Sequence, residues 1–131
     1  MPKPRIVVAD DTEQIVDLVV TRLELAGYQT FVARHGFAAL QVISDVAPHG
    51  VVLDIGMPGR DGFQVLQAMK ANPKTSAIPV LMLTARNAQA DVRRAIACGA
   101  RDYLAKPFDD QVLLARVAKL LRRRPTATTW V

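Results

Sequence analysis

The stretch GVVLDIGMPGRDGFQVL, residues 50–66, decides the fold of this chain. Its opening residues are apolar up to Asp54, a pattern typical of a strand that helices cover on both faces. A loop with Pro and Gly follows, and a segment of helical spacing then covers about residues 61–71. The stretch therefore predicts a buried strand that ends on a carboxylate and leads into a helix.

The same alternation of a short apolar run and a longer helical segment occurs along the whole chain. Predicted strands cover residues 5–9, 28–33, 50–54, 79–83 and 100–105, and predicted helices cover about 12–26, 36–46, 61–71, 87–97 and 109–123. Thr12 is placed to cap the first helix and Gly27 to end it. The second strand alternates apolar and polar residues, which favours an edge position. The pattern predicts an α/β fold with one doubly wound, five-stranded parallel sheet and five helices.

Length and composition indicate a single domain. A chain of 131 residues is too short for two full cores, and with only 5% aromatic residues its core must consist of Val, Leu, Ile and Ala. We assign residues 1–124 to the domain and 125–131, which show no strand or helix pattern, to a tail or the start of a linker. No apolar stretch has the length of a signal sequence or membrane span, so we expect a cytoplasmic protein without membrane contact.

The formal charge of +5 is unevenly distributed. Residues 1–61 carry 8 acidic and 5 basic side chains, whereas residues 62–131 carry 4 acidic and 12 basic ones. A basic half can indicate nucleic-acid binding, but here the bases are spread over several segments with few aromatic residues for stacking. A solvated face is therefore favoured, and nucleic acid is not indicated as a partner of this segment.

Polar residues collect where the predicted strands end. They are Asp10 and Asp11 after the first strand, Asp54 at the end of the third, Thr84 after the fourth and Lys106 after the fifth. Because the carboxyl ends of parallel strands lie at one edge of the sheet, all five residues should face that edge. Three neighbouring carboxylates repel one another unless a cation lies among them, and hard oxygen ligands favour Mg²⁺.

This set of groups suits phosphoryl transfer, in which catalysis is mostly positioning and charge neutralisation. Asp54 would be the nucleophile, Lys106 would pair with a phosphoryl oxygen, and Thr84 would donate a hydrogen bond. Taken singly, each residue has a plainer role as a helix cap or a surface charge. Their joint occurrence at the same end of four strands favours the functional interpretation.

The sequence resembles the receiver domain of response regulators over about residues 4–123. The resemblance is carried by VVADD (7–11), GVVLDIGMPGRDGFQVL (50–66), IPVLMLTA (78–85) and GARDYLAKPF (99–108), and RHGFAAL (34–40) also fits. Each motif alone is weak, but all of them in order at these separations are highly specific. The resemblance implies a flavodoxin-like sheet with strand order 2-1-3-4-5 and a role in two-component signalling.

The resemblance also implies roles for the acidic residues. Asp54 would accept a phosphoryl group from a phosphohistidine of a sensor histidine kinase or a phosphotransfer protein. Mg²⁺ would be bound by Asp11, Asp54 and the backbone carbonyl of Gly56. Asp10 would act mainly through a metal-bound water.

Further residues of the family's switch are matched. Thr84 and Lys106 would hold the phosphoryl group, and Tyr103 resembles the switch aromatic, which turns inward as Thr84 moves toward the phosphate. The peptide bond before Pro107 would be cis. The face formed by the fourth helix, fifth strand and fifth helix would then control a partner or a homodimer.

Gly56 and Arg86 stand at positions that vary in the family and can set the lifetime of the phosphorylated state. Gly56 offers no side chain to cover the phosphoryl group, whereas Arg86 is long enough to reach it. We hypothesise that Arg86 is the main control on hydrolysis. A solvent-facing arginine at a helix start is the plain alternative.

Two other functions stay open on the sequence alone. A phosphatase with Asp10 as nucleophile would have a similar sheet, but such enzymes usually have an Asp-x-Asp spacing, and Asp10 and Asp11 are adjacent. A receiver-like binding module that is not phosphorylated usually lacks one of the acidic, Thr or Lys positions, and all are present here. We therefore expect a signalling domain rather than an enzyme.

Overall fold

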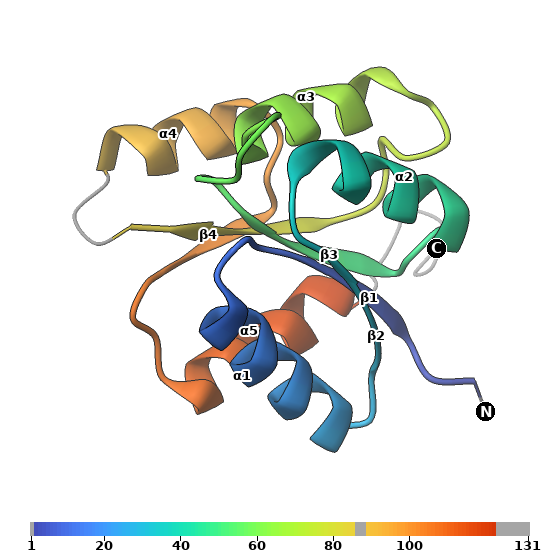
Figure 1. Ribbon diagram of the computed structural model, residues 1–131, viewed down its shortest axis with the longest axis vertical. Coiled ribbons are helices and arrows are strands. Elements are labelled where there is room, and N and C mark those ends of the chain that lie inside the picture. Colours follow the sequence, from blue (N-terminus) through green and yellow to red (C-terminus); the bar gives the residue numbers. More distant parts are fainter. Residues whose placement is uncertain (1, 86–88, 123–131) are drawn as a thin grey trace, which may run out of the picture.

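The structure, a computed structural model, describes residues 2–85 and 89–122. Within them, strands and helices alternate (Figure 1). The strands are β1 Arg5–Ala9, β2 Gln29–Ala33, β3 Gly50–Asp54, β4 Val80–Thr84 and β5 Asp102–Ala105. The helices are α1 Glu13–Leu25, α2 Gly36–Val46, α3 Gly62–Ala71, α4 Gln89–Ala97 and α5 Asp110–Leu121. This succession confirms the predicted α/β class.

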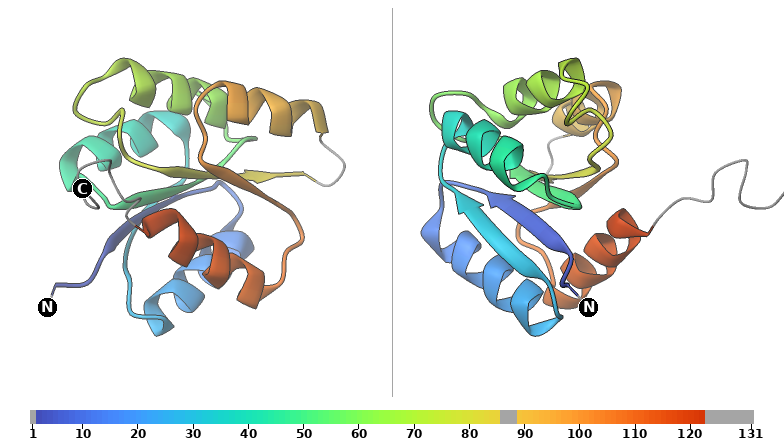
Figure 2. Two further views of the ribbon diagram at one scale, coloured as in Figure 1. Left: turned by 180° about the vertical axis from the view of Figure 1, so that it is seen from behind. Right: turned by 90° about the vertical axis from the view of Figure 1, so that its right-hand side faces the viewer.

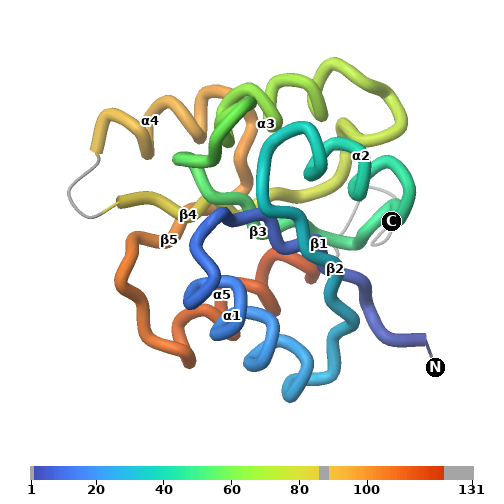
Figure 3. Tube along the Cα trace, in the orientation of Figure 1, coloured from blue at the N-terminus to red at the C-terminus, as the bar shows by residue number. Residues whose placement is uncertain are grey.

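All strands are parallel and form one sheet in the order β2-β1-β3-β4-β5, as predicted. Helices α1 and α5 cover one face of the sheet, and α2, α3 and α4 cover the other (Figures 1 and 2). Strand order reverses at β1, because β2 pairs on one side of it and β3 on the other. The turns after β1, β3 and β5 consequently emerge at the same edge, on the left in Figure 3.

The core consists of two apolar layers separated by the sheet. In β1, Val7 and Ala9 pack toward α2 and α3, while Ile6 and Val8 pack toward α1 and α5, as the two-residue period of a strand requires. Every residue of β3 is buried, which confirms the reading of GVVLD as a covered strand. Strand β2 lies at the edge with Val32 exposed, so the prediction from its alternating pattern is also confirmed.

The first helix begins after Thr12 as predicted, but the Thr12 side chain does not cap it. Thr12 is the N-cap residue of α1, but its hydroxyl makes no capping hydrogen bond. Instead the Thr12 backbone N–H donates to Oδ1 of Asp10 at 2.9 Å. The carboxylate of Asp10 thereby orders the turn after β1, and the turn in turn holds one carboxylate oxygen in place.

Several predicted element bounds shift by one or two residues, and the start of β5 is one that shifts by two. This strand begins at Asp102 rather than at residue 100. Gly99, with φ of 105°, ends the helical path of α4, and the Ala100 N–H bonds back to the carbonyl of Ala95. Residue 100 is therefore still part of the helix terminus and cannot join the strand.

Some expectations concern residues outside the described part of the chain. The first residues of the predicted helix 87–97 and the predicted boundary after residue 124 are among them. The division into a domain 1–124 and a tail 125–131 stays a prediction. Across residues 2–85 and 89–122, no helix combines the length and apolar character that a membrane span requires.

Candidate functional site

The carboxyl edge of the sheet carries a cluster of acidic side chains. Asp10 and Asp11 follow β1, and Asp54 is the last residue of β3, the neighbouring strand. One carboxylate oxygen of each lies within 4.8 Å of the others. Asp10 and Asp54 are buried, with exposed fractions of 0% and 7%, whereas Asp11 is exposed. Two of the negative charges are therefore largely removed from water, which requires a compensating cation.

Lys106 supplies that cation in this structure. Its Nζ lies 2.9 Å from Oδ2 of Asp10 and 3.0 Å from Oδ1 of Asp54. The Lys106 N–H also donates to the carbonyl of Thr84, which ties the start of the β5–α5 loop to the end of β4. The Lys106–Pro107 peptide bond is cis. Residues from three strand ends thus meet at one ammonium group.

Burial and neighbouring charges shift the pKa values of both partners. Burial raises the pKa of Asp54 above its ordinary 3.8 and the negative charge of Asp10 adds to this, while hydrogen bonds from Lys106 and the Gly56 backbone partly oppose it. Burial by itself would lower the pKa of Lys106, but the hydrogen bonds with Asp10 and Asp54 outweigh it, so its pKa is raised. Lys106 is therefore a stable ammonium ion at neutral pH.

The acidic cluster has the donor set of a magnesium site. Oδ1 of Asp10 accepts the Thr12 N–H, and Oδ2 shares the Lys106 ammonium with Asp54. The convergence of hard anionic oxygens within 4.8 Å fits a small hard cation such as Mg²⁺. Asp10, Asp11 and Asp54 are the side chains that could hold it.

Thr84 lies at the same edge, on the strand that pairs with β3. Its side chain is 1% exposed, and among the described residues its hydroxyl has no hydrogen-bond partner. A buried hydroxyl without a protein partner is uncommon and is typical of a position where a bound group can accept its hydrogen bond. Next to Asp54, that hydroxyl is available to an oxyanion.

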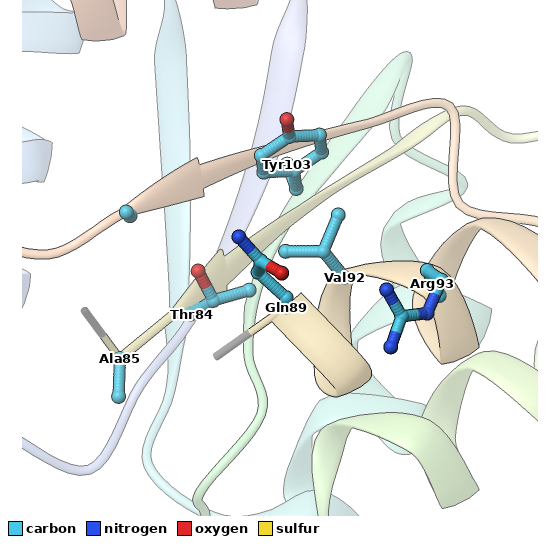
Figure 4. Close-up of a pocket in the computed structure, with 7 residues that line it drawn as sticks. Thr84, Ala85, Gln89, Val92, Arg93 and Tyr103 are labelled. Atoms are coloured by element: carbon cyan, nitrogen blue, oxygen red, sulfur yellow. The ribbon is translucent and has the colours of Figure 1, made fainter. Parts of the chain in front are cut away.

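Thr84 also lines a hollow of about 440 Å³ between β4, β5 and α4, together with Tyr103 of β5. Figure 4 shows the Tyr103 ring on its strand, with Gln89, Val92 and Arg93 of α4 around the hollow. Tyr103 is 39% exposed, so its ring lies at the surface. The hollow therefore lies directly beside both Thr84 and Tyr103.

Comparison with known proteins identifies the family. The sequence pattern described as the response regulator receiver domain matches residues 6–118. The chain belongs to this family. It is 43% identical to the DNA-binding dual master transcriptional regulator RpaA of Synechocystis over 92% of its own length, and 40% identical to response regulator PleD of Caulobacter vibrioides over 90%. It spans 50% of the length of the first and 26% of the second.

Solved structures agree with this assignment. The chemotaxis response regulator CheY4 of Vibrio cholerae superposes with a TM-score of 0.86 at 28% identity, covering 92% of this chain and all of that one. The receiver domain of Francisella response regulator 1452 superposes with a TM-score of 0.85 at 32% identity, covering 92% of this chain and 98% of that one. The chain is thus a receiver domain of two-component signal transduction, a family of signalling domains rather than enzymes.

The structure of this receiver brings together Asp10, Asp11, Asp54 and Lys106, and it places Thr84 at the end of the adjoining strand. Arg86 lies outside the described residues. Sequence reasoning did not single out Gln89 or Val92, which line the hollow beside Thr84. No local pattern could have found them, because the hollow exists only where α4 packs over β4 and β5.

Proposed function

We propose that this receiver accepts a phosphoryl group on Asp54 from a phosphohistidine of a sensor histidine kinase or a phosphotransfer protein, in a reaction that depends on Mg²⁺. The observation that carries the proposal is the position of the Asp54 carboxylate: it is nearly buried at a strand end, within 4.8 Å of two other carboxylates, with an ammonium ion at 3.0 Å. Such an arrangement serves a nucleophile whose product carries additional negative charge.

The transfer exchanges one bond for another. An Asp54 carboxylate oxygen forms a bond to phosphorus as the bond between phosphorus and the donor imidazole nitrogen breaks, and that nitrogen keeps the electron pair. Mg²⁺ held by Asp11, Asp54 and the Gly56 carbonyl, with Asp10 acting through a metal-bound water, would supply positive charge to the phosphoryl oxygens. Lys106 pairs with one of these oxygens, and the unpartnered Thr84 hydroxyl donates to another.

The geometry argues against a phosphatase with Asp10 as nucleophile. Asp10 is completely buried, and its Oδ1 accepts the Thr12 N–H while its Oδ2 faces the Lys106 ammonium. A carboxylate engaged on both oxygens and closed off from solvent cannot approach an incoming phosphorus. Asp54, by contrast, has Gly56 beside it, where even a Cβ atom would be 3.9 Å from Oδ2.

The test is chemical phosphorylation of the purified chain. The protein is incubated with Mg²⁺ and a small acyl phosphate, and intact-mass spectrometry should show a gain of one phosphoryl group that peptide mapping assigns to Asp54. Chelation of Mg²⁺ should prevent the gain. Absence of labelling both with the acyl phosphate and with phosphorylated histidine donors would favour an unphosphorylated binding module. Rapid phosphate release from ordinary monoesters would instead favour a phosphatase.

We propose that phosphorylation changes the conformation of the face formed by α4, β5 and α5, and that this face then controls a partner. In this change Tyr103 turns into the hollow as Thr84 moves toward the phosphoryl group. The room for this motion is the hollow beside the two residues. Arg116 on this face pairs with Asp102 of the same chain at 3.1 Å and also donates to the Tyr103 carbonyl. A homodimer or a partner protein would use the same face, and we propose a cytoplasmic location.

The raised pKa of Asp54 predicts a particular acid dependence of the nucleophile. Because the folded pKa lies above 3.8, the carboxylate takes up a proton at a higher pH than an ordinary aspartate as the solution is acidified. A carbon-detected NMR titration of the metal-free protein should therefore give a midpoint above 3.8 for Asp54, and added Mg²⁺ should move it down. A metal-free midpoint at or below the ordinary value would contradict the prediction.

Gly56 leaves the Asp54 carboxylate uncovered, so a side chain at position 56 should shield the phosphoryl group from water. Gly56→Met places an apolar chain beside Oδ2 of Asp54 without a backbone conformation that requires glycine. We expect the phosphorylated state to last roughly 3- to 10-fold longer, because exclusion of water slows hydrolysis. The loss of the phosphoryl mass over time measures the lifetime of the phosphorylated state. Thr21→Met, at an exposed position of α1, is the control. An unchanged lifetime would show that access at position 56 does not limit hydrolysis.

A further inference from the structure

The first turn of α2 packs directly against the β3–α3 loop, residues 55–61. The Gly36 N–H donates to the carbonyl of Pro58 at 3.4 Å. A Cβ atom at Gly36 would overlap the carbonyl oxygen of Arg60, so only glycine permits this approach. Nothing in the chemistry proposed above uses this contact, although the segment RHGFAAL that forms it is part of the sequence resemblance.

The side chain of Phe37, the next residue, packs against the β3–α3 loop at the protein surface. The Arg60 guanidinium carbon lies 5.0 Å from the centre of the Phe37 ring, which is cation–π geometry. The ring is also 3.3 Å from the point where a Cβ of Gly59 would lie, and Gly59 has a φ of 78°. The ring thus lies against two consecutive loop residues. Phe37 is nevertheless 58% exposed, so it contributes little to the core.

The other end of the loop is held by α3. The Gly62 N–H donates to the carbonyl of Ile55 at 2.8 Å, and a Cβ at Gly62 would overlap the Asp54 carbonyl oxygen. Asp61 and Gln64 form a reciprocal capping box at the start of α3. The stretch between these anchors contains Gly56, whose backbone lies so close to the Asp54 carboxylate that a Cβ atom there would be 3.9 Å from Oδ2. Its path therefore depends on what supports the loop tip at Gly59 and Arg60.

We infer that Phe37 and Arg60 are positioning residues for the metal site: they clamp the β3–α3 loop so that the Gly56 backbone stays beside Asp54. This inference rests on the proposed magnesium site. The clamp acts through the loop, since neither side chain is among the groups that converge on the carboxylates. Its removal should loosen the loop and weaken Mg²⁺ binding without unfolding the domain, because Phe37 lies at the surface.

The experiment compares Phe37→Ala and Phe37→Leu with the wild-type chain. Calorimetric titration gives the Mg²⁺ dissociation constant, and hydrogen exchange of the metal-free protein gives the protection of the loop amides of Gly56, Met57, Gly59 and Arg60. We expect Phe37→Ala to bind Mg²⁺ roughly 2- to 5-fold more weakly, the fold-change that corresponds to an exposed cation–π contact. Hydrogen exchange of the loop amides should be faster in Phe37→Ala than in the wild type. Phe37→Leu should give intermediate values of both quantities, because leucine keeps apolar bulk but has no π face.

Two further variants separate positioning from general stability. Arg60→Gln should reproduce the weaker Mg²⁺ binding, and Arg60→Lys should restore much of it because the cation is kept. Leu25→Ala, which truncates a more exposed apolar side chain on α1, should leave the Mg²⁺ constant unchanged. The clamp is refuted if the wild type binds Mg²⁺ and Phe37→Ala matches it in affinity and loop exchange. A wild type that binds no Mg²⁺ would instead contradict the metal site itself.

Discussion

The Asp54→Asn variant is expected to take up no phosphoryl group and, without metal, to be more stable than the wild-type chain at neutral pH. Loss of labelling follows because the amide cannot act as the nucleophile. The gain in stability follows from burial: Asp54 is 7% exposed beside Asp10, and burial raises its pKa. Keeping the carboxylate ionised in the folded state therefore costs free energy that an isosteric amide does not.

The stabilising effect of Asp54→Asn should depend on pH. A carboxyl group whose folded pKa is raised binds its proton more tightly in the folded than in the unfolded chain, so its contribution to stability falls as pH rises through the folded pKa. The advantage of Asn should thus be full above that pKa, about 1 kcal/mol in the free energy of unfolding, and should vanish in acid. Urea unfolding in the presence of a chelator measures this difference in stability. Asp17→Asn, at an exposed position of α1, is the control. Equal or lower stability at neutral pH would contradict the electrostatic argument.

Lys106→Met is expected to have the opposite effect on the metal-free protein, with a loss of about 2 to 3 kcal/mol in the free energy of unfolding. The ammonium is the cation shared by Asp10 and Asp54, at 2.9 and 3.0 Å, and it is only 22% exposed. Methionine keeps the apolar stem of the side chain but leaves two buried carboxylates facing each other without a counterion.

Magnesium provides the decisive measurement for this variant. If the cation site is the acidic cluster, saturating Mg²⁺ should stabilise Lys106→Met more than it stabilises the wild type, because it restores the missing positive charge. Lys119→Met on exposed α5 should show neither the loss nor the rescue. Combining Lys106→Met with Asp54→Asn should cost less than the sum of the separate effects, since one repelling charge is gone. An additive double mutant would mean that the two residues are not coupled.

Local sequence patterns predicted the backbone of this domain well. The apolar run GVVLD is a fully buried strand, and the alternating second run is the edge strand. Predictions failed where a side chain had two possible roles or where a helix end overlapped a strand. Thr12 has the right position for a cap, but Asp10 makes the local hydrogen bond, and Ala100 belongs to the end of α4 rather than to β5.

The sequence by itself determined which residues meet at the functional edge. Parallel strands with short apolar cores must present their carboxyl ends together, so the placement of Asp10, Asp54 and Lys106 at the ends of three such strands was sufficient to bring them to one edge. It could not determine that one ammonium ion contacts both buried carboxylates.

The tertiary structure decided the contacts between segments that are distant along the chain. Only packing shows that Arg116 pairs with Asp102 of its own chain and that Phe37 lies against the loop of Arg60. It also leaves the Thr84 hydroxyl without a partner within the described residues. The physical reason is the distance along the chain over which a pattern is informative. Strand and helix patterns depend on residues only a few positions apart. An ion pair or a ring contact between distant segments depends on how whole elements are placed relative to one another and on the rotamers that this placement allows.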